Sequence, residues 1–202
     1  MQPQPIAAPT RSMKQTQADQ PEIFTQIYEA DCNLAVWQRS VPQELNTYLD
    51  CLLHHPWPLN FKGITSLDDI EATLLNTLPE YQGRSALIAD IYLLTDMFSC
   101  LFDLERVGLR LATLKDAMCP RFHVDHVPCR LVTTWCGPAT QWLPVPLQEK
   151  DSTDSWNKLE VGDVALLKGS GWFENEHGGI VHRSPEVESG QMRLFMSLDF
   201  AN

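Results

Sequence analysis

The second half of the chain carries the pattern that most limits its fold, a succession of short apolar runs separated by turns that contain glycine or proline. No helical periodicity lies between these runs after residue 106. Short strands joined by such turns are typical of all-β sandwiches and barrels. The pattern predicts a jelly roll over residues 106–202, with strands at 107–114, 131–136, 142–143, 164–167, 180–182 and 192–200.

The last of these runs alternates throughout its length. One set of residues is apolar (Met192, Leu194, Met196, Leu198 and Phe200), and the other consists of Arg193, Phe195, Ser197 and Asp199. Alternate side chains of a strand point to opposite faces, so the apolar set should pack under helices and the other set should face the barrel interior. A buried Arg193 needs an anionic partner, because an unpaired buried charge is costly. That partner is either an acid such as Asp199 or a ligand carboxylate, which a guanidinium binds in bidentate fashion.

Helical periodicity dominates the first half. Three helices are predicted, from the capping box at Ser40 to Leu53, from Ile70 to Leu78, and from Leu87 to Phe102. Aspartates interrupt the third segment, which indicates a packing helix and not a membrane span.

The third helix runs almost directly into the first strand of the second half, which favours one domain. We therefore expect a single α+β domain over residues 23–202, in which residues 23–105 are mainly a helical support for a cupin-like jelly roll. A short strand is expected at 34–37. Residues 1–22 lack apolar periodicity and predict a disordered tail.

Composition narrows the function classes. The 202 residues are 44% hydrophobic, enough for one core, and the net charge of −11 argues against nucleic-acid binding, which needs clustered Lys and Arg. Residues 1–22 show no apolar segment of a secretory signal, and the six cysteines include no Cys-x-x-Cys pair. The expected protein is cytoplasmic, has reduced thiols and has neither nucleic acid nor membrane as a partner.

His123 and Asp125 form a His-x-Asp pair, the strongest candidate for chemistry. In an extended strand both side chains project to one face, and together they supply two thirds of the 2-His-1-carboxylate triad of non-haem Fe(II) sites. The pair alone is a weak signal, because chance nearly supplies one. His182 lies 57 residues after Asp125, and Arg193 follows 11 residues after His182.

Two other groups of potential metal ligands are less favoured. Cys119, Cys129 and Cys136 surround the pair, but structural zinc prefers tighter Cys/His spacing. His54 and His55 end a predicted helix, where histidines usually bond to carbonyls or to water.

The order and strand placement of His123, Asp125, His182 and Arg193 resemble those of the Fe(II)- and 2-oxoglutarate-dependent oxygenases. The resemblance implies that the two histidines and Asp125 hold Fe(II) and that Arg193 binds the far carboxylate of 2-oxoglutarate. Under the same resemblance, the hydroxyl of Thr133 or Ser197 would donate to the co-substrate. Arg110 is an alternative to Arg193 as the residue that binds its carboxylate.

Three motifs are more closely similar to a bacterial family catalogued as a domain of unknown function, and this similarity extends back to Asn33–Trp37. The motifs are Met118–Asp125, Gly162–Gly169 and Val181–Pro185. The family resemblance implies no established activity. Its link to zinc-homeostasis genes keeps Zn(II) as an alternative metal.

Three hypotheses remain open from the sequence. The first is an oxygenase that hydroxylates an unidentified small molecule or protein, and the second is a non-catalytic cupin-like protein that binds a divalent metal. The third is a β-barrel interaction module whose histidines are structural. Whether Arg193 faces the metal or is neutralised by Asp199 discriminates the first two.

Further expectations concern the surroundings of the site. Tryptophans 135, 142 and 172 are candidate pocket walls, and residues 170–179 form a candidate lid loop. Arg130 and Arg183 are expected to face away from the site or to lie in turns.

Overall fold

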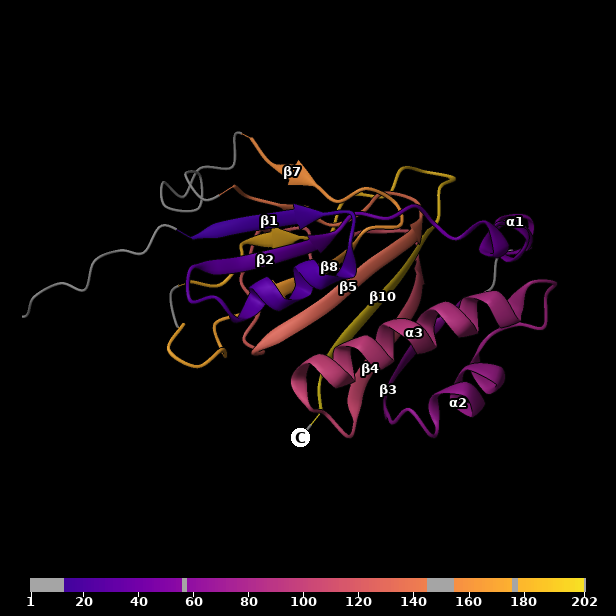
Figure 1. Cartoon of the computed structure of the whole chain (residues 1–202). Helices are drawn as coiled ribbons and strands as arrows, with labels where there is room; N and C mark the ends of the chain where they lie inside the picture. The colour runs from indigo at the N-terminus through magenta and orange to yellow at the C-terminus, as the bar shows by residue number, and fades with distance from the viewer. Residues whose placement is uncertain (1–12, 56–57, 145–154, 176–177, 202) are drawn as a thin grey trace, which may run out of the picture.

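Two β-sheets form the framework of the molecule (Figure 1). The computed structural model describes residues 13–55, 58–144, 155–175 and 178–201. The large sheet has seven strands in the order β1 (Lys14–Ala18), β2 (Cys32–Trp37), β8 (Val164–Lys168), β5 (Cys129–Cys136), β10 (Arg193–Phe200), β4 (Val107–Leu114) and β3 (Asn60–Thr65). The small sheet has the order β7 (Asn157–Lys158), β6 (Gln141–Trp142) and β9 (His182–Arg183). Neighbouring strands of the large sheet are antiparallel, except for the parallel pair β1 and β2.

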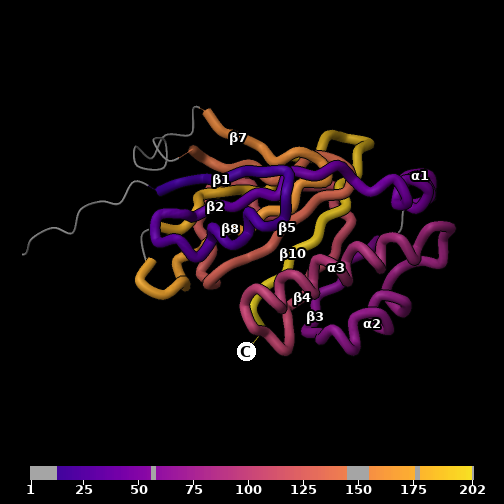
Figure 2. The backbone as a smooth tube through the Cα atoms, viewed as in Figure 1, coloured from indigo at the N-terminus to yellow at the C-terminus, as the bar shows by residue number. Residues whose placement is uncertain are grey.

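The helices are α1 (Asn46–His54), α2 (Ile70–Thr77) and α3 (Arg84–Phe102), with 3-10 segments η1 (Pro21–Tyr28) and η2 (Gln43–Leu45). Their apolar side chains share one core with the outer face of the large sheet, where Leu109, Leu131 and Leu198 lie. Phe98 of α3 packs on Phe200 of β10, with ring centroids 5.7 Å apart. The tube in Figure 2 shows α2 and α3 beside the β3–β4 side of the sheet.

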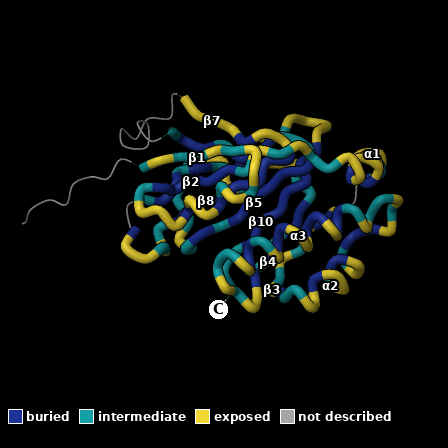
Figure 3. The backbone as a smooth tube through the Cα atoms, viewed as in Figure 1, coloured by how far each residue is buried: buried dark blue, intermediate teal, exposed yellow. Residues whose placement is uncertain are grey.

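The small sheet covers part of the opposite, inner face of the large sheet. Trp142 of β6 packs there with Val132 of β5 and Phe195 of β10, in a second core that is separate from the helical one. The molecule therefore has three layers, namely helices, large sheet and small sheet. In Figure 3 the strands of the large sheet are mostly buried, whereas exposed positions gather on the helices and connecting loops.

The alternation of β10 is confirmed. Met192, Leu194, Met196 and Leu198 belong to the core under the helices, and Phe200 packs against it. Phe195 belongs to the inner core. This register turns Arg193, Ser197 and Asp199 to the inner face, since they alternate with the apolar set.

Residue Asp90 of α3 ties the helical layer to the sheet. Its carboxylate receives two hydrogen bonds from Arg39, at 2.6 and 2.9 Å, and one from the indole nitrogen of Trp135, at 2.7 Å. The side chains of Asp90 and Trp135 are buried, and that of Arg39 is 9% exposed. The third predicted helix is thus a packing helix. Among the described residues, it is the one helix whose length and apolarity would allow it to cross a membrane.

Two expectations about the first half were wrong. Residues 14–18 of the expected tail form β1, and residues 60–65 form β3, so the large sheet takes three strands from the part of the chain before residue 106. The expectation that the β-sheet core is confined to residues 106–202 was therefore wrong, because β1, β2 and β3 belong to the large sheet. Both β1 and β3 are edge strands, which have polar, half-exposed residues and therefore little apolar alternation. Residues 1–12 lie outside the described part.

Candidate metal and co-substrate site

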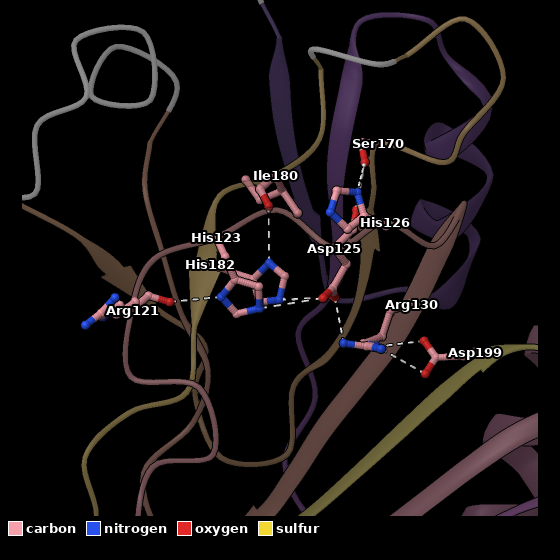
Figure 4. Close-up of polar contacts among 9 residues, drawn as sticks. All are labelled: Arg121, His123, Asp125, His126, Arg130, Ser170, Ile180, His182 and Asp199. Carbon is pink, nitrogen blue, oxygen red and sulfur yellow. Dashed lines mark hydrogen bonds and ion pairs between the residues drawn. The ribbon is translucent and has the colours of Figure 1, made fainter.

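His123 and His182 are brought together by a short antiparallel bridge on the inner side of the large sheet. The backbone N–H of each donates to the carbonyl of the other, at 3.0 and 2.9 Å. Asp125 follows two residues later in a loop. Its Oδ1 lies 3.6 Å from Nε2 of His123, and its Oδ2 lies 3.3 Å from Nε2 of His182. Figure 4 shows the two imidazoles side by side, with the carboxylate directed at them.

Each imidazole is oriented by a backbone carbonyl. Nδ1 of His123 lies 2.9 Å from the carbonyl oxygen of Arg121, and Nδ1 of His182 lies 3.2 Å from that of Ile180. A carbonyl can only accept, so Nδ1 of each ring donates to it, and Nε2 is the nitrogen that faces Asp125. This arrangement is typical of metal-binding histidines, whose outer nitrogen is fixed by a hydrogen-bond acceptor.

The guanidinium of Arg130 holds the Asp125 carboxylate in place. Nη1 of Arg130 donates to Asp125 at 2.7 Å, while Nε and Nη2 donate to the two oxygens of Asp199, at 2.7 and 2.9 Å (Figure 4). Burial raises the pKa of Asp125, but the hydrogen bond and charge of His182 and the charges of Arg130 and His123 outweigh it and bring the pKa to about 2. Asp125 is therefore an ionised carboxylate at neutral pH, as a metal ligand would need to be.

The donor set fits a divalent transition metal. One ligand atom from each of His123, Asp125 and His182 lies within 4.8 Å of the other two. Two neutral imidazoles and one carboxylate are the facial set of non-haem Fe(II) sites and also suit Zn(II). The side chain of His182 is 7% exposed and that of His123 is 34% exposed, so the site lies near a cavity mouth.

Arg193 is a buried cation without a carboxylate partner among the residues that the structure describes. It is 1% exposed, and burial lowers the pKa of its guanidinium to about 10. Its nitrogens donate to three hydroxyl groups: Ser184 at 2.9 Å, Thr140 at 3.0 Å and Thr134 at 3.3 and 3.4 Å. The ring of Phe195 lies under it, 4.4 Å from Cζ. Asp199 does not neutralise Arg193, because both of its oxygens bind Arg130.

The two histidines and the Arg193 cluster line one narrow cavity of about 50 Å³. Its lining includes His123 and His182 at the metal end and Thr140, Ser184 and Arg193 at the other. A wider cavity of about 390 Å³ adjoins it, because both are lined by Met118, Cys119, Arg130 and Phe195. Arg110 and Ser197 line the wider cavity.

Thr133 does not reach the site. Its hydroxyl donates to the carbonyl of Asp163 at 2.9 Å, on the face of β5 that also carries Leu131 and Trp135. The neighbouring Thr134 faces inward, and its hydroxyl accepts hydrogen bonds from Arg193. Ser197 and Arg110 face inward but line the wider cavity and not the narrow one.

The expectation that Arg130 faces away from the site was wrong, since its guanidinium contacts Asp125 directly. Arg183 binds Gln141 at 2.7 Å, but it also lines the narrow cavity. Arg130 lies on the same face of β5 as Val132 and opposite Asp199 of β10, a placement that depends on the strand register and not on a local sequence pattern. The three hydroxyls that hold Arg193 come from three separate segments, and no local spacing connects them.

The remaining candidates lie elsewhere. All six cysteines are free thiols, and no metal-ligating cluster other than His123, Asp125 and His182 is found among the described residues. His126 turns away to the hydroxyl of Ser170, at 3.0 Å (Figure 4). None of Trp135, Trp142 and Trp172 lines either of the two cavities. The expected lid loop includes residues 176–177, which lie outside the described residues.

A helix-backed large sheet, a smaller facing sheet and a His-Asp-His set beside them define a double-sheet protein with a candidate metal site. Residues 18–199 match the family described as "Protein of unknown function (DUF1826)", and the chain belongs to this family. The fold of the chain is similar to that of a solved structure named as an oxygenase. A search of curated proteins gave no significant match.

Solved structures with a similar fold include oxygenases of low sequence identity. A Shewanella oneidensis protein provisionally named an oxygenase has a TM-score of 0.55 and 11% identity, with 94% of this chain and 89% of that chain covered. The rice dioxygenase for auxin oxidation has a TM-score of 0.49 and 12% identity, and the match covers 72% of this chain but only 57% of the rice protein. A viral collagen prolyl hydroxylase of Paramecium Bursaria Chlorella virus-1, solved with 2-oxoglutarate, has a TM-score of 0.45 and 8% identity, with 84% and 97% covered.

Proposed function

We propose that this protein is an Fe(II)- and 2-oxoglutarate-dependent oxygenase that hydroxylates an as yet unidentified substrate. The observation that carries the proposal is Arg193, a buried guanidinium that shares a cavity with two oriented imidazoles and has only hydroxyl partners among the described residues. A cation in this position is costly unless a ligand anion joins it. The far carboxylate of 2-oxoglutarate would supply that anion.

His123, Asp125 and His182 would hold Fe(II) from one side, which leaves the opposite positions open to small ligands. When bound, Fe(II) supplies the oxidative decarboxylation of 2-oxoglutarate to succinate and CO2, coupled to insertion of one oxygen atom of O2 into a C–H bond of the substrate. Arg130 keeps the Asp125 carboxylate fixed and ionised. The carbonyls of Arg121 and Ile180 orient the two rings so that Nε2 of each is the nitrogen that would bind the metal.

The co-substrate seat is made by Arg193 and its three hydroxyl partners. Each hydroxyl accepts a hydrogen bond from the guanidinium, so its own O–H remains available to donate to a carboxylate. Thr134, Thr140, Ser184 and Arg193 are all buried, which strengthens a charged hydrogen bond by excluding water. Phe195 packs against the guanidinium and keeps it in place.

Melting-temperature measurements on the full chain test the proposal. Mn(II), which replaces Fe(II) without oxidation, should raise the melting temperature, and 2-oxoglutarate should raise it further only when the metal is present. At about a hundredfold excess over its Kd, a ligand adds roughly 2.7 kcal/mol, or about 5–10 °C for a chain of this size. His182→Ala should abolish both shifts, whereas His126→Ala, a histidine outside the triad, should retain them.

The alternatives give different results in the same experiment. A shift with Mn(II) or Zn(II) and no further shift with 2-oxoglutarate would overturn the oxygenase and favour a non-catalytic metal-binding protein. Absence of any metal-dependent shift would leave the histidines as structural residues.

A further inference from the structure

Two cationic side chains, Lys62 and Arg110, line the wider cavity beside the candidate metal site. In the β3–β4–β10 register, Lys62 lies opposite Arg110, and Arg110 lies opposite Ser197. Their flanking residues Phe61, Leu109 and Leu111 pack in the helical core, so Lys62 and Arg110 share the inner face. Two like charges directly opposite each other on one face of a sheet are destabilising.

Neither cation is neutralised by a residue that the structure describes. The buried Nε of Arg110 has no hydrogen-bond partner, and neither side chain makes an ion pair with the described acids. Asp199 also lines this cavity, but Arg130 binds both of its oxygens. The donors of Lys62 and Arg110 thus lie beside a cavity in which no described residue supplies an anion to pair with them.

The rest of the cavity is apolar and roomy. Ile64, Met118 and Phe195 contribute its apolar lining, and Gly63 and Gly108 contribute no side chain beyond the backbone. A volume of about 390 Å³ is within the range of small-molecule sites. Met118, Cys119, Arg130 and Phe195 connect it to the narrow cavity that holds His123 and His182.

We propose that this cavity is the substrate pocket and that it selects a small organic anion, whose carboxylate or phosphate binds Lys62 and Arg110 while its apolar part lies toward Phe195 and the metal. The inference rests on the proposed oxygenase function for the reaction, but the anion site itself rests only on the cavity and its two cations. It differs from the Arg193 seat in strand position and in cavity.

The binding test uses the full chain loaded with Mn(II) and saturated with 2-oxoglutarate, so that the Arg193 seat is filled. Phenylacetate and phenyl phosphate serve as anionic probes, and phenylacetamide serves as a neutral probe of the same shape. Calorimetric or ligand-observed NMR titration should show at least about tenfold tighter binding of the anions, because charge-assisted hydrogen bonds are the stronger kind. Equal binding of phenylacetate and phenylacetamide would overturn the proposal.

Variants locate the anion. Arg110→Gln should weaken phenylacetate binding about tenfold or more, and Lys62→Gln should weaken it less, since Lys62 is more exposed. Arg106→Gln, which removes an exposed arginine four residues away, is the matched control and should bind like the wild type. Anion binding that survives Arg110→Gln but disappears in Arg193→Gln would overturn the proposal, because the probe would then occupy the co-substrate seat.

Two further readouts separate a binding role from a structural one. Arg110→Gln should leave the melting temperature unchanged or raise it, because it removes a repulsive cross-strand pair. Gly108→Val should block the probe without disturbing 2-oxoglutarate, since a Cβ at Gly108 meets its nearest neighbour, Cβ of Asp199, at an ordinary 3.6 Å. A fall in melting temperature for Arg110→Gln together with unchanged probe affinity would overturn the proposal.

The same titrations distinguish this proposal from the proposed function. If 2-oxoglutarate does not bind the metal-loaded protein but phenylacetate binds through Arg110, the oxygenase fails and the anion pocket holds. If 2-oxoglutarate binds and no anionic probe prefers the wider cavity, the oxygenase holds and the anion pocket fails.

Discussion

Arg130 lies 2.7 Å from Asp125 and makes a bidentate pair with Asp199 on the neighbouring strand β10. The loop carboxylate of the candidate metal site is thus connected to the rigid sheet through one guanidinium. Arg130 contacts no histidine of the triad in the described hydrogen bonds and ion pairs, so we regard it as a positioning residue.

Arg130→Met should weaken metal binding by about 10–100-fold, the range typical for loss of a residue that orients a metal ligand. Asp199→Asn should have a smaller effect, because Arg130 keeps its bond to Asp125. Titration of Mn(II) into the full chain measures both, and the exposed Arg106→Met is the control. Wild-type affinity in Arg130→Met would show that Asp125 needs no support from the sheet.

Arg193→Met should leave the free energy of unfolding within about 1 kcal/mol of the wild type, or raise it, when no ligand is present. The reason is that replacement of an uncompensated buried charge by an apolar side chain of similar volume is neutral or stabilising. Urea unfolding measures the change. A loss of several kcal/mol would mean that Arg193 serves the fold and not a ligand.

Arg39→Met should lower the free energy of unfolding, because it leaves the buried Asp90 carboxylate without its cationic partner. We expect a loss of about 3–5 kcal/mol, the cost of breaking a buried ion pair from one side. The double variant Arg39→Met/Asp90→Leu should recover part of it in urea unfolding, because it removes the buried charge but leaves the Trp135 indole N–H without its acceptor. Equal stability of the single variant and the wild type would contradict the role of this pair in holding α3 to the sheet.

Thr134→Val and Thr133→Val form a matched pair that tests the orientation of β5. Thr134 contacts Arg193, so its loss should weaken 2-oxoglutarate binding by about 5–10-fold, equivalent to roughly one hydrogen bond. Thr133 donates to Asp163, so its replacement should affect stability but not co-substrate affinity. Calorimetric titration of the metal-loaded proteins gives both values, and a reversed order would contradict the register of β5.

Sequence reasoning succeeded where a local pattern was strong. The alternation of residues 192–200 correctly assigned the apolar side of β10 to the helices, and the His-x-Asp pair with His182 assembled as one cluster. The second and third helices lie within three residues of their predicted ranges. The helix expected from a capping box at Ser40 instead begins as a 3-10 segment at Gln43 and becomes α-helical at Asn46, with no side-chain cap. Each of these signals depends on residues that are close in sequence or that share one strong period.

It failed where neighbours far apart in sequence decide the outcome. The edge strands β1 and β3 have one exposed face and little apolar alternation, so only pairing with β2 and β4 defines them. Thr133 and Thr134 differ by one position, and the strand parity needed to choose between them follows from the packed structure. The carbonyls that accept from Nδ1 of the two imidazoles are backbone groups, and residue types do not predict which backbone groups make such bonds.

Anaerobic calorimetric titration of 2-oxoglutarate into the full chain tests the central claim most directly, with Fe(II)-loaded, metal-free and Fe(II)-loaded Arg193→Met protein in parallel. We predict one 2-oxoglutarate per chain in the Fe(II)-loaded wild type, no measurable binding without metal, and about a 100-fold weaker affinity in Arg193→Met, since two charge-assisted hydrogen bonds are lost. Equal affinity in the wild type and Arg193→Met, or binding that does not depend on the metal, would contradict the assignment of this site.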